Sequence, residues 1–191
     1  MSELALTLTM ALARNVAAID RKIRSGAAVD KATEGAVGMQ LSGRSFGIIG
    51  GGNIGLALAR MLCGAFNAVI YLYDPVLSPE GLQRWADLVP SARFHRVERV
   101  RDMLPHVDVL SLHVPLLDST RNLIGEEELR LMQKHALLIN TARGGVVNEQ
   151  ALFKALDEGW IAGAGIDAYE KEPFTREDYP GLIAHERVIS T

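Results

Sequence analysis

Three glycines with the spacing Gly50-x-Gly52-x-x-Gly55 are the residues of this chain best suited to bind a phosphorylated ligand. The first glycine permits a tight turn, the second lets a ligand approach the backbone, and the third lets a helix pack closely. Because N–H groups at a helix start favour anions, Asn53 and Ile54 are expected to contact a diphosphate there. An apolar strand before the glycines and a helix after them are typical of a dinucleotide site.

An acid at the end of the next apolar run indicates which dinucleotide this site prefers. Asp74 follows the run Ala68–Tyr73 and lies nineteen residues after Gly55. A carboxylate at this place can accept hydrogen bonds from the adenosine ribose and repels a 2′-phosphate, which favours NAD over NADP. The alternative is a structural glycine turn followed by an unrelated surface acid.

Short apolar segments that alternate with helical ones must position these residues. Strands are predicted over 45–50, 68–74, 93–97, 108–114, 136–142, 162–167 and 187–191, and helices over 54–65, 98–105, 126–134 and 148–158. This alternation predicts an α/β fold, a doubly wound parallel sheet of the Rossmann type with helices on both faces. Ligands of such sheets bind at the carboxyl ends of the strands.

An apolar segment precedes the predicted sheet. Its large residues recur at helical spacing, which predicts one long helix over 3–24, and a second apolar stripe indicates that this helix is buried on more than one side. A secretory signal peptide is the alternative. Glu3 in place of a basic start, and Thr7 and Thr9 within the apolar run, favour the amphipathic helix.

The composition indicates one globular domain with a further element, or a piece of a larger protein. The chain has 191 residues, of which 48% are hydrophobic and 23% charged. A net charge of -3 gives no electrostatic reason to expect nucleic-acid or membrane binding. The single cysteine, Cys63, excludes an internal disulfide, and its apolar surroundings predict a packing role. With no apolar stretch of membrane-spanning length, a protein of the cytosol or of an organelle matrix is expected, and we assign it to the cytoplasm. No metal site is predicted.

Polar residues end three successive predicted strands. The three strings are His113-Val114-Pro115, Asn140-Thr141-Ala142-Arg143-Gly144-Gly145 and Asp167-Ala168-Tyr169-Glu170-Lys171-Glu172-Pro173. Together with the glycine turn they closely resemble the NAD-binding domain of the D-isomer-specific 2-hydroxyacid dehydrogenases, over nearly the whole chain. The resemblance implies an NAD-dependent oxidoreductase that transfers hydride between NAD and the C2 atom of a 2-hydroxy or 2-keto acid.

The resemblance also implies roles for individual residues. Arg143 would hold the substrate carboxylate, Asp167 would lie near the nicotinamide, and Glu172 would raise the pKa of a catalytic histidine. Taken alone, Arg143 would suit a surface ion pair and Glu172 a solvated turn. The cofactor contacts implied at the strand ends are His113, Val114, Pro115, Thr120, Thr141, Ala142, Arg143 and Asp167.

The resemblance leaves parts of the family's pattern unmatched. No histidine of this chain matches the family's catalytic histidine, which would follow Glu172 by about twenty residues, and the family's substrate domain is not matched. We therefore predict a truncated chain. Residues 1–26 would form an interdomain and dimerisation helix, and residues 27–191 would form the NAD-binding domain. The chain would form a homodimer and would be catalytically inactive on its own. The alternative is a corepressor-like or pseudoenzyme module that binds NAD and dimerises. The sequence does not identify the 2-hydroxy acid.

Overall fold

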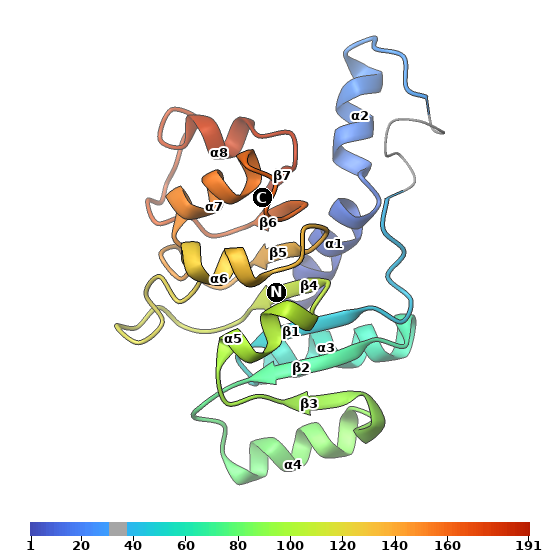
Figure 1. The fold of residues 1–191 in the computed structure, drawn as a ribbon, viewed down its shortest axis with the longest axis vertical. Coiled ribbons are helices and arrows are strands. Elements are labelled where there is room, and N and C mark those ends of the chain that lie inside the picture. Colours follow the sequence, from blue (N-terminus) through green and yellow to red (C-terminus); the bar gives the residue numbers. More distant parts are fainter. Residues whose placement is uncertain (31–37) are drawn as a thin grey trace.

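One seven-stranded parallel sheet forms the centre of the molecule, which is a computed structural model that describes residues 1–30 and 38–191 (Figure 1). The strand order is β3-β2-β1-β4-β5-β6-β7. The strands are β1 Ser45–Ile49, β2 Val69–Tyr73, β3 Phe94–Arg96, β4 Val109–Leu112, β5 Leu137–Asn140, β6 Gly163–Ile166 and β7 Val188–Ser190. The predicted doubly wound parallel sheet is confirmed. From β1, the strands β2 and β3 are added on one side and β4 to β7 on the other. Such sheets bind ligands at this switch point, between β1 and β4.

Helices cover both faces of the sheet. They are α1 Ser2–Ala13, α2 Val16–Arg24, α3 Asn53–Phe66, α4 Pro79–Leu88, α5 Val100–Met103, α6 Glu126–Leu131, α7 Glu149–Asp157 and α8 Pro180–Ala184. In Figure 1, α5, α6 and α7 lie in front of the sheet and α1 and α3 lie behind it. Neighbouring strand residues enter different cores: Ile48 packs with Leu8 and Leu58, and Ile49 packs with Leu129 and Leu152. Burial on both faces explains why the strands are continuous apolar runs.

The predicted single helix over 3–24 is wrong, because the chain turns between two helices. Asn15 has a φ of 53°, in the left-handed region that asparagine tolerates better than most residues. α1 packs on β5, β6 and β7 and buries Leu8 and Leu12, whereas α2 has no buried residue and projects from the body (Figure 1). Burial on two sides is therefore wrong for α2. Between α2 and β1, residues 31–37 lie outside the described residues.

Two helices, α4 and α8, are absent from the sequence prediction. α4 buries only Trp85 among its own residues, although Leu82, Trp85 and Val89 recur at helical spacing along it. Its start does carry local helix signals, because Pro79 occupies the first turn and the Ser78 hydroxyl accepts a hydrogen bond from Gly81 N at 3.1 Å. The helix was therefore detectable both from its cap and from its apolar spacing.

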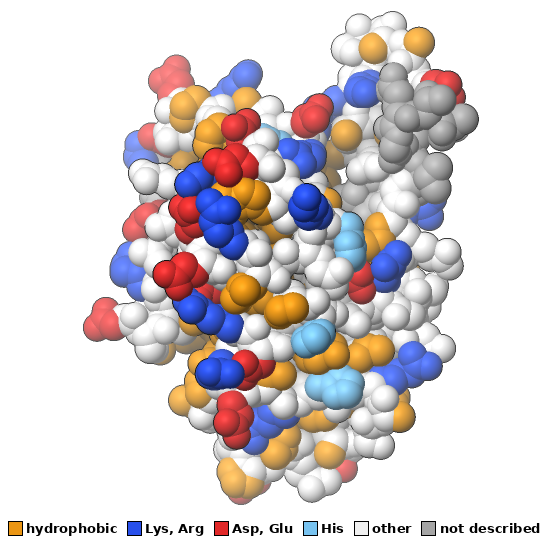
Figure 2. Space-filling view, viewed as in Figure 1, with side chains coloured by type: hydrophobic (Ala, Val, Ile, Leu, Met, Phe, Trp, Pro, Cys, Tyr) orange, Lys and Arg blue, Asp and Glu red, His pale blue; other side chains and the backbone are white. Residues whose placement is uncertain are grey.

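The surface over α6 and α7 carries interleaved acidic and basic side chains (Figure 2). Glu126 accepts hydrogen bonds from Arg130 at 2.9 Å and from Lys154 at 3.1 Å.

Cys63 is half-buried against the core, and this burial raises the pKa of its thiol. Among the described residues, no helix is both long and apolar enough to cross a membrane. Within the same residues, no three His, Cys, Asp or Glu side chains gather as metal ligands.

Candidate functional site

The glycine turn joins β1 to α3 and leaves open space above its second glycine. Gly50 has a φ of +102°, and a Cβ there would lie 2.5 Å from the His113 carbonyl oxygen. A Cβ on Gly55 would overlap the Gly50 carbonyl, whereas one on Gly52 would meet no described atom within 4 Å. Gly52 is also the N-cap of α3 and offers no capping side chain. The first N–H groups of α3 therefore adjoin a space that suits an anion.

Asp74 is anchored to this turn. One carboxylate oxygen accepts a hydrogen bond from Gly51 N at 2.7 Å, and the other accepts one from Val76 N at 3.0 Å. Each oxygen retains a lone pair that can accept a further hydrogen bond. The sequence predicted a carboxylate near the turn but not its direct bond to Gly51.

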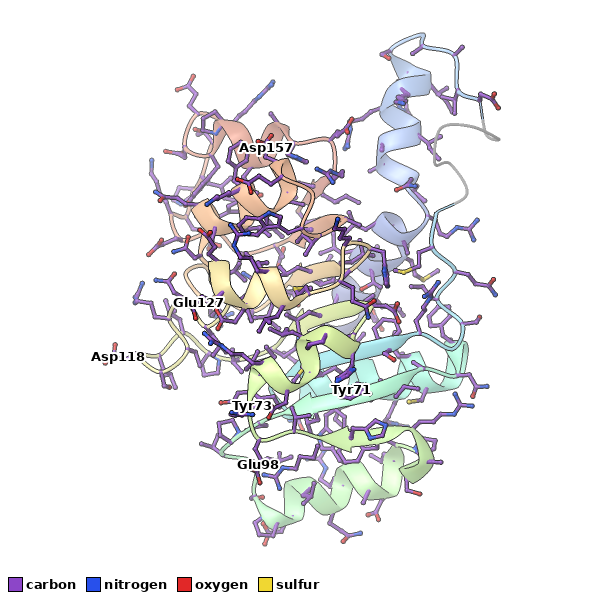
Figure 3. The ribbon with its side chains drawn as sticks, viewed as in Figure 1. Tyr71, Tyr73, Glu98, Asp118, Glu127 and Asp157 are labelled. Carbon is purple, nitrogen blue, oxygen red and sulfur yellow. The ribbon has the colours of Figure 1, made fainter. Side chains whose placement is uncertain are left out.

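A hollow of about 330 Å³ adjoins this carboxylate. It is lined by Asp74, Pro75, Arg96, Val97 and Glu98, which lie at or just beyond the carboxyl ends of β2 and β3. Figure 3 labels Tyr73 and Glu98, which mark this edge of the sheet. The hollow offers a place for the adenosine end of a dinucleotide, beside the acid predicted to bind its ribose.

Residues that follow the central strands line up along the carboxyl edge. His113 N donates to Ile49 O at 2.7 Å, and Asp167 N donates to Asn140 O at 2.9 Å, so the pairing continues past the strands. Since Leu112 pairs with Asn140, the next residues, His113 and Thr141, are neighbours in this row. The structure thus brings the predicted residues after β1, β4, β5 and β6 to one edge.

Two buried polar atoms in this row have no hydrogen-bond partner among the described residues. They are His113 Nδ1 and Thr141 Oγ1. Because an unpaired buried polar atom is costly, a ligand with donors and acceptors along this edge would satisfy them. The residues present therefore fit a bound dinucleotide.

His113 is held in its neutral form. Its Nε2 atom lies 2.9 Å from the Ser111 hydroxyl, and burial, reinforced by the positive amino group of Met1, lowers the His113 pKa to about 4. A neutral imidazole can offer one donor and one acceptor to its surroundings. At neutral pH this histidine is therefore unsuited to supplying a proton.

Asn140 links the two segments that carry the candidate catalytic residues. It is 3% exposed, and its Nδ2 donates to Arg143 O at 3.2 Å and to Ala168 O at 3.5 Å. Its Oδ1 accepts a hydrogen bond from Ala142 N at 3.1 Å. The sequence prediction did not assign a role to Asn140. A polar residue at the end of an apolar strand was the signal available.

Arg143 and Glu172 project from these linked segments with exposed side chains. Arg143 Nη1 donates to Ala142 O at 2.6 Å, and the Glu172 carboxylate accepts a hydrogen bond from Tyr169 N at 3.2 Å. Among the described residues, no histidine is hydrogen-bonded to Glu172. Arg143 and Glu172 thus belong to two segments that Asn140 connects, but their side chains make no hydrogen bond to each other.

Two other predicted residues have partners of their own. Asp167 accepts a hydrogen bond from the Thr191 hydroxyl at 3.0 Å. The Thr120 hydroxyl donates to Pro115 O at 2.6 Å and accepts from Leu117 N at 2.8 Å, which closes the turn after β4. Thr120 therefore shapes the segment that carries Val114 and Pro115, and its contact with a cofactor stays a prediction.

A larger hollow lies at the opposite edge of the sheet. It has a volume of about 720 Å³ and is lined by residues of α1 and α2 and by residues near the amino ends of β1, β5, β6 and β7. None of the predicted site residues lines it. The volume of a hollow therefore does not identify the cofactor site in this chain. The residues that suit a dinucleotide are those of the glycine turn and the carboxyl edge of the sheet.

Comparison with known proteins places this arrangement in a family. Residues 6–191 match the model of the family described as D-isomer specific 2-hydroxyacid dehydrogenase, NAD binding domain. A glyoxylate reductase of Korarchaeum cryptofilum is 40% identical over 190 residues, covering 98% of this chain and 54% of the relative. A D-3-phosphoglycerate dehydrogenase of Methanocaldococcus jannaschii is 35% identical, covering 100% of this chain and 34% of the relative.

Solved structures agree with this placement. A crystal structure of D-lactate dehydrogenase with NAD+ from Lactobacillus jensenii has a TM-score of 0.81 and 30% identity, covering 100% of this chain and 57% of that one. The chain spans about half the length of the glyoxylate reductase and of the D-lactate dehydrogenase structure. Sequence, fold and glycine turn agree, and the chain belongs to the D-isomer-specific 2-hydroxyacid dehydrogenase family, of which it carries the NAD-binding domain.

Proposed function

We propose that this chain binds NAD along the carboxyl edge of its sheet, as part of an NAD-dependent oxidoreductase acting on a small 2-hydroxy or 2-keto acid. The observation that carries the proposal is the open space above Gly52, with Asp74 bonded to the neighbouring Gly51. Bound NAD would supply the hydride-transfer chemistry at its nicotinamide. The chain's own residues would bind the cofactor, orient the substrate and polarise its carbonyl group.

Different parts of the edge suit different parts of the cofactor. We assign the diphosphate to the N–H groups of Gly52, Asn53 and Ile54 and the adenosine ribose to Asp74, supported by the open space at Gly52 and the bond of Asp74 to Gly51. Toward the nicotinamide end, Thr141 and Asp167 continue the row. Thr141 Oγ1, without a described partner, is free to bond there.

Arg143 and Glu172 are proposed as the substrate-side residues. The exposed Arg143 guanidinium can hold a carboxylate through two parallel hydrogen bonds and polarise the neighbouring carbonyl. Glu172 would stabilise the protonated form of a catalytic histidine. Since no described histidine is bonded to Glu172, we expect the 191-residue chain alone to bind NAD with little or no turnover.

Calorimetry of the purified chain with NAD and with NADP tests the cofactor proposal. We expect NAD to bind more tightly, because the Asp74 carboxylate would repel the 2′-phosphate of NADP. Equal affinity would overturn the role of Asp74, and no binding of either would overturn the proposed site. Measurable NADH formation with D-lactate or D-glycerate would refute the expectation of inactivity.

We further propose a cytoplasmic homodimer that forms through the N-terminal helices. The support is α2, which projects from the body without a buried residue and exposes Val16 and Ile23 by 55% and 57% (Figure 1). A second copy could cover this apolar surface. Light scattering tests the assembly, and a well-folded monomer at micromolar concentration would contradict it.

A further inference from the structure

The glycine turn is supported from outside by α4, the helix at the far edge of the sheet beyond β3 (Figure 1). Trp85 of α4 is 0% exposed, and its indole N–H donates a hydrogen bond to the Gly51 carbonyl at 2.8 Å. Its hydrogen bond reaches the turn that is proposed to bind the diphosphate.

Gly51 is fixed on both of its backbone polar groups. Its N–H donates to the Asp74 carboxylate at 2.7 Å, and its carbonyl accepts from Trp85. The Gly51 carbonyl belongs to the same planar peptide group as the Gly52 N–H, and in a trans peptide these two groups point in opposite directions. By holding the carbonyl, Trp85 therefore also sets the direction of the Gly52 N–H, away from the indole.

The indole itself is held firmly. Its ring stacks on Phe94 of β3 at a centroid distance of 5.5 Å and an interplanar angle of 21°. Leu77, just before α4, packs beside Gly51, so that a Cβ on Gly51 would lie 3.1 Å from it. A rigid donor in a closely packed setting can fix the orientation of a backbone group that a solvated turn would leave free.

The neighbouring residue of α4 contacts the next part of the turn. Both terminal nitrogens of Arg84 donate to Asn53 Oδ1 at 3.2 Å, at the first residue of α3. This places a positive charge beside the helix start whose N–H groups would bind the diphosphate. α4 thus contacts the turn on both sides of Gly52.

We propose that Trp85 is a positioning residue for the dinucleotide, which acts by orienting the Gly52 N–H toward the diphosphate. The inference rests on the proposed function, since it assumes that the diphosphate binds at this turn. A positioning role of Trp85 predicts one result that a packing role does not. Loss of the indole N–H should weaken binding of any ligand with a diphosphate, whether or not the ligand carries nicotinamide.

The test is Trp85→Phe in the 191-residue chain, with NAD and ADP affinities measured by calorimetry. Phenylalanine keeps an aromatic ring in the core but leaves the Gly51 carbonyl without its donor. We expect both affinities to fall by the same factor, about tenfold. The control is Trp160→Phe, because Trp160 is the other tryptophan and its indole bonds Glu158 at 3.0 Å, with no predicted site residue involved. The control should bind both ligands as the unaltered chain does.

A second variant separates positioning from stability. Val188→Ala truncates a buried side chain of β7 in the core on the other side of the sheet and leaves Trp85 and Phe94 unaltered, so it should lower the melting temperature while both affinities stay within about twofold. If Trp85→Phe does not fold, benzothienylalanine at position 85, which replaces the N–H by sulfur in nearly the same shape, gives the same comparison. Unchanged affinities in the folded variant, or a loss for NAD but not for ADP, would overturn the inference. If the unaltered chain binds neither ligand, the proposed function itself fails.

Discussion

The Asn140 side-chain amide donates a hydrogen bond to the carbonyl of Arg143 at 3.2 Å, from a position that is 3% exposed. The same amide nitrogen reaches the carbonyl of Ala168 at 3.5 Å. One buried side chain therefore connects the segment of the proposed carboxylate-binding arginine with the segment that leads to Glu172. The relative placement of the substrate-side residues depends on this amide.

Asn140→Asp should separate these two segments. A carboxylate can still accept from Ala142 N, but it has no N–H for the Arg143 and Ala168 carbonyls and would place a negative charge beside them. We expect the free energy of unfolding to fall by about 2–3 kcal/mol, measured by urea titration. NAD affinity should fall more than ADP affinity, because the disturbed segments lie at the nicotinamide end.

Asn148→Asp is the matched control for this change. Asn148 is the N-cap of α7, where its Oδ1 accepts from Ala151 N at 2.9 Å, and aspartate caps a helix about as well as asparagine. The same substitution should therefore leave stability and binding nearly unchanged at position 148. Equal effects at the two positions would contradict a special role for Asn140.

Gly52→Ala should abolish most NAD binding without harming the fold. Its φ of −67° is accessible to alanine, and the added Cβ would meet no described atom within 4 Å, so the methyl group would enter only the space proposed for the diphosphate. We expect an affinity loss of about tenfold or more with little change in melting temperature. Gly64→Ala in the same helix also meets open space and should stabilise the chain by about 1 kcal/mol while binding stays unchanged. Normal NAD affinity in Gly52→Ala would place the diphosphate elsewhere.

The sequence predicted those parts of the site that depend on local patterns. Gly50, Gly52 and Gly55 are identifiable because their spacing follows from a strand–turn–helix connection, and the parallel sheet followed from alternating apolar runs. All seven predicted strands are present, with ends that differ by a few residues. The strand ends were predicted to meet at one edge, and they do.

The sequence could not predict contacts between distant segments. The hydrogen bond from Trp85 to Gly51 spans 34 positions, and nothing in the local sequence distinguishes it from packing. The bend at Asn15 was also missed, because the apolar repeat continues across it and a single left-handed residue leaves no trace in that repeat. Periodicity reports which faces are apolar, but it does not show whether a helix stays straight.

Asp74→Asn should reduce the preference for NAD over NADP. The amide oxygen can still accept from Gly51 N, but the charge that would repel a 2′-phosphate is gone. We expect the ratio of NAD to NADP affinity to fall by about tenfold, mainly through tighter NADP binding. Asp157→Asn removes the same charge from the end of α7, where Figure 3 labels it, and should leave the ratio unchanged. An unchanged ratio in Asp74→Asn would show that another group selects the cofactor.

His113 should make the stability of the chain fall in mild acid. Its pKa is lowered to about 4 in the folded chain, against about 6.5 in an unfolded one, so the unfolded state binds more protons between these values. The contribution is fully present above pH 6.5 and is lost as the pH falls toward 4, by up to about 3 kcal/mol. His113→Gln should flatten this part of the stability–pH profile, measured by urea unfolding across the range. His95→Gln, which changes an exposed histidine, should keep the slope, and a slope that survives in His113→Gln would assign it to other groups.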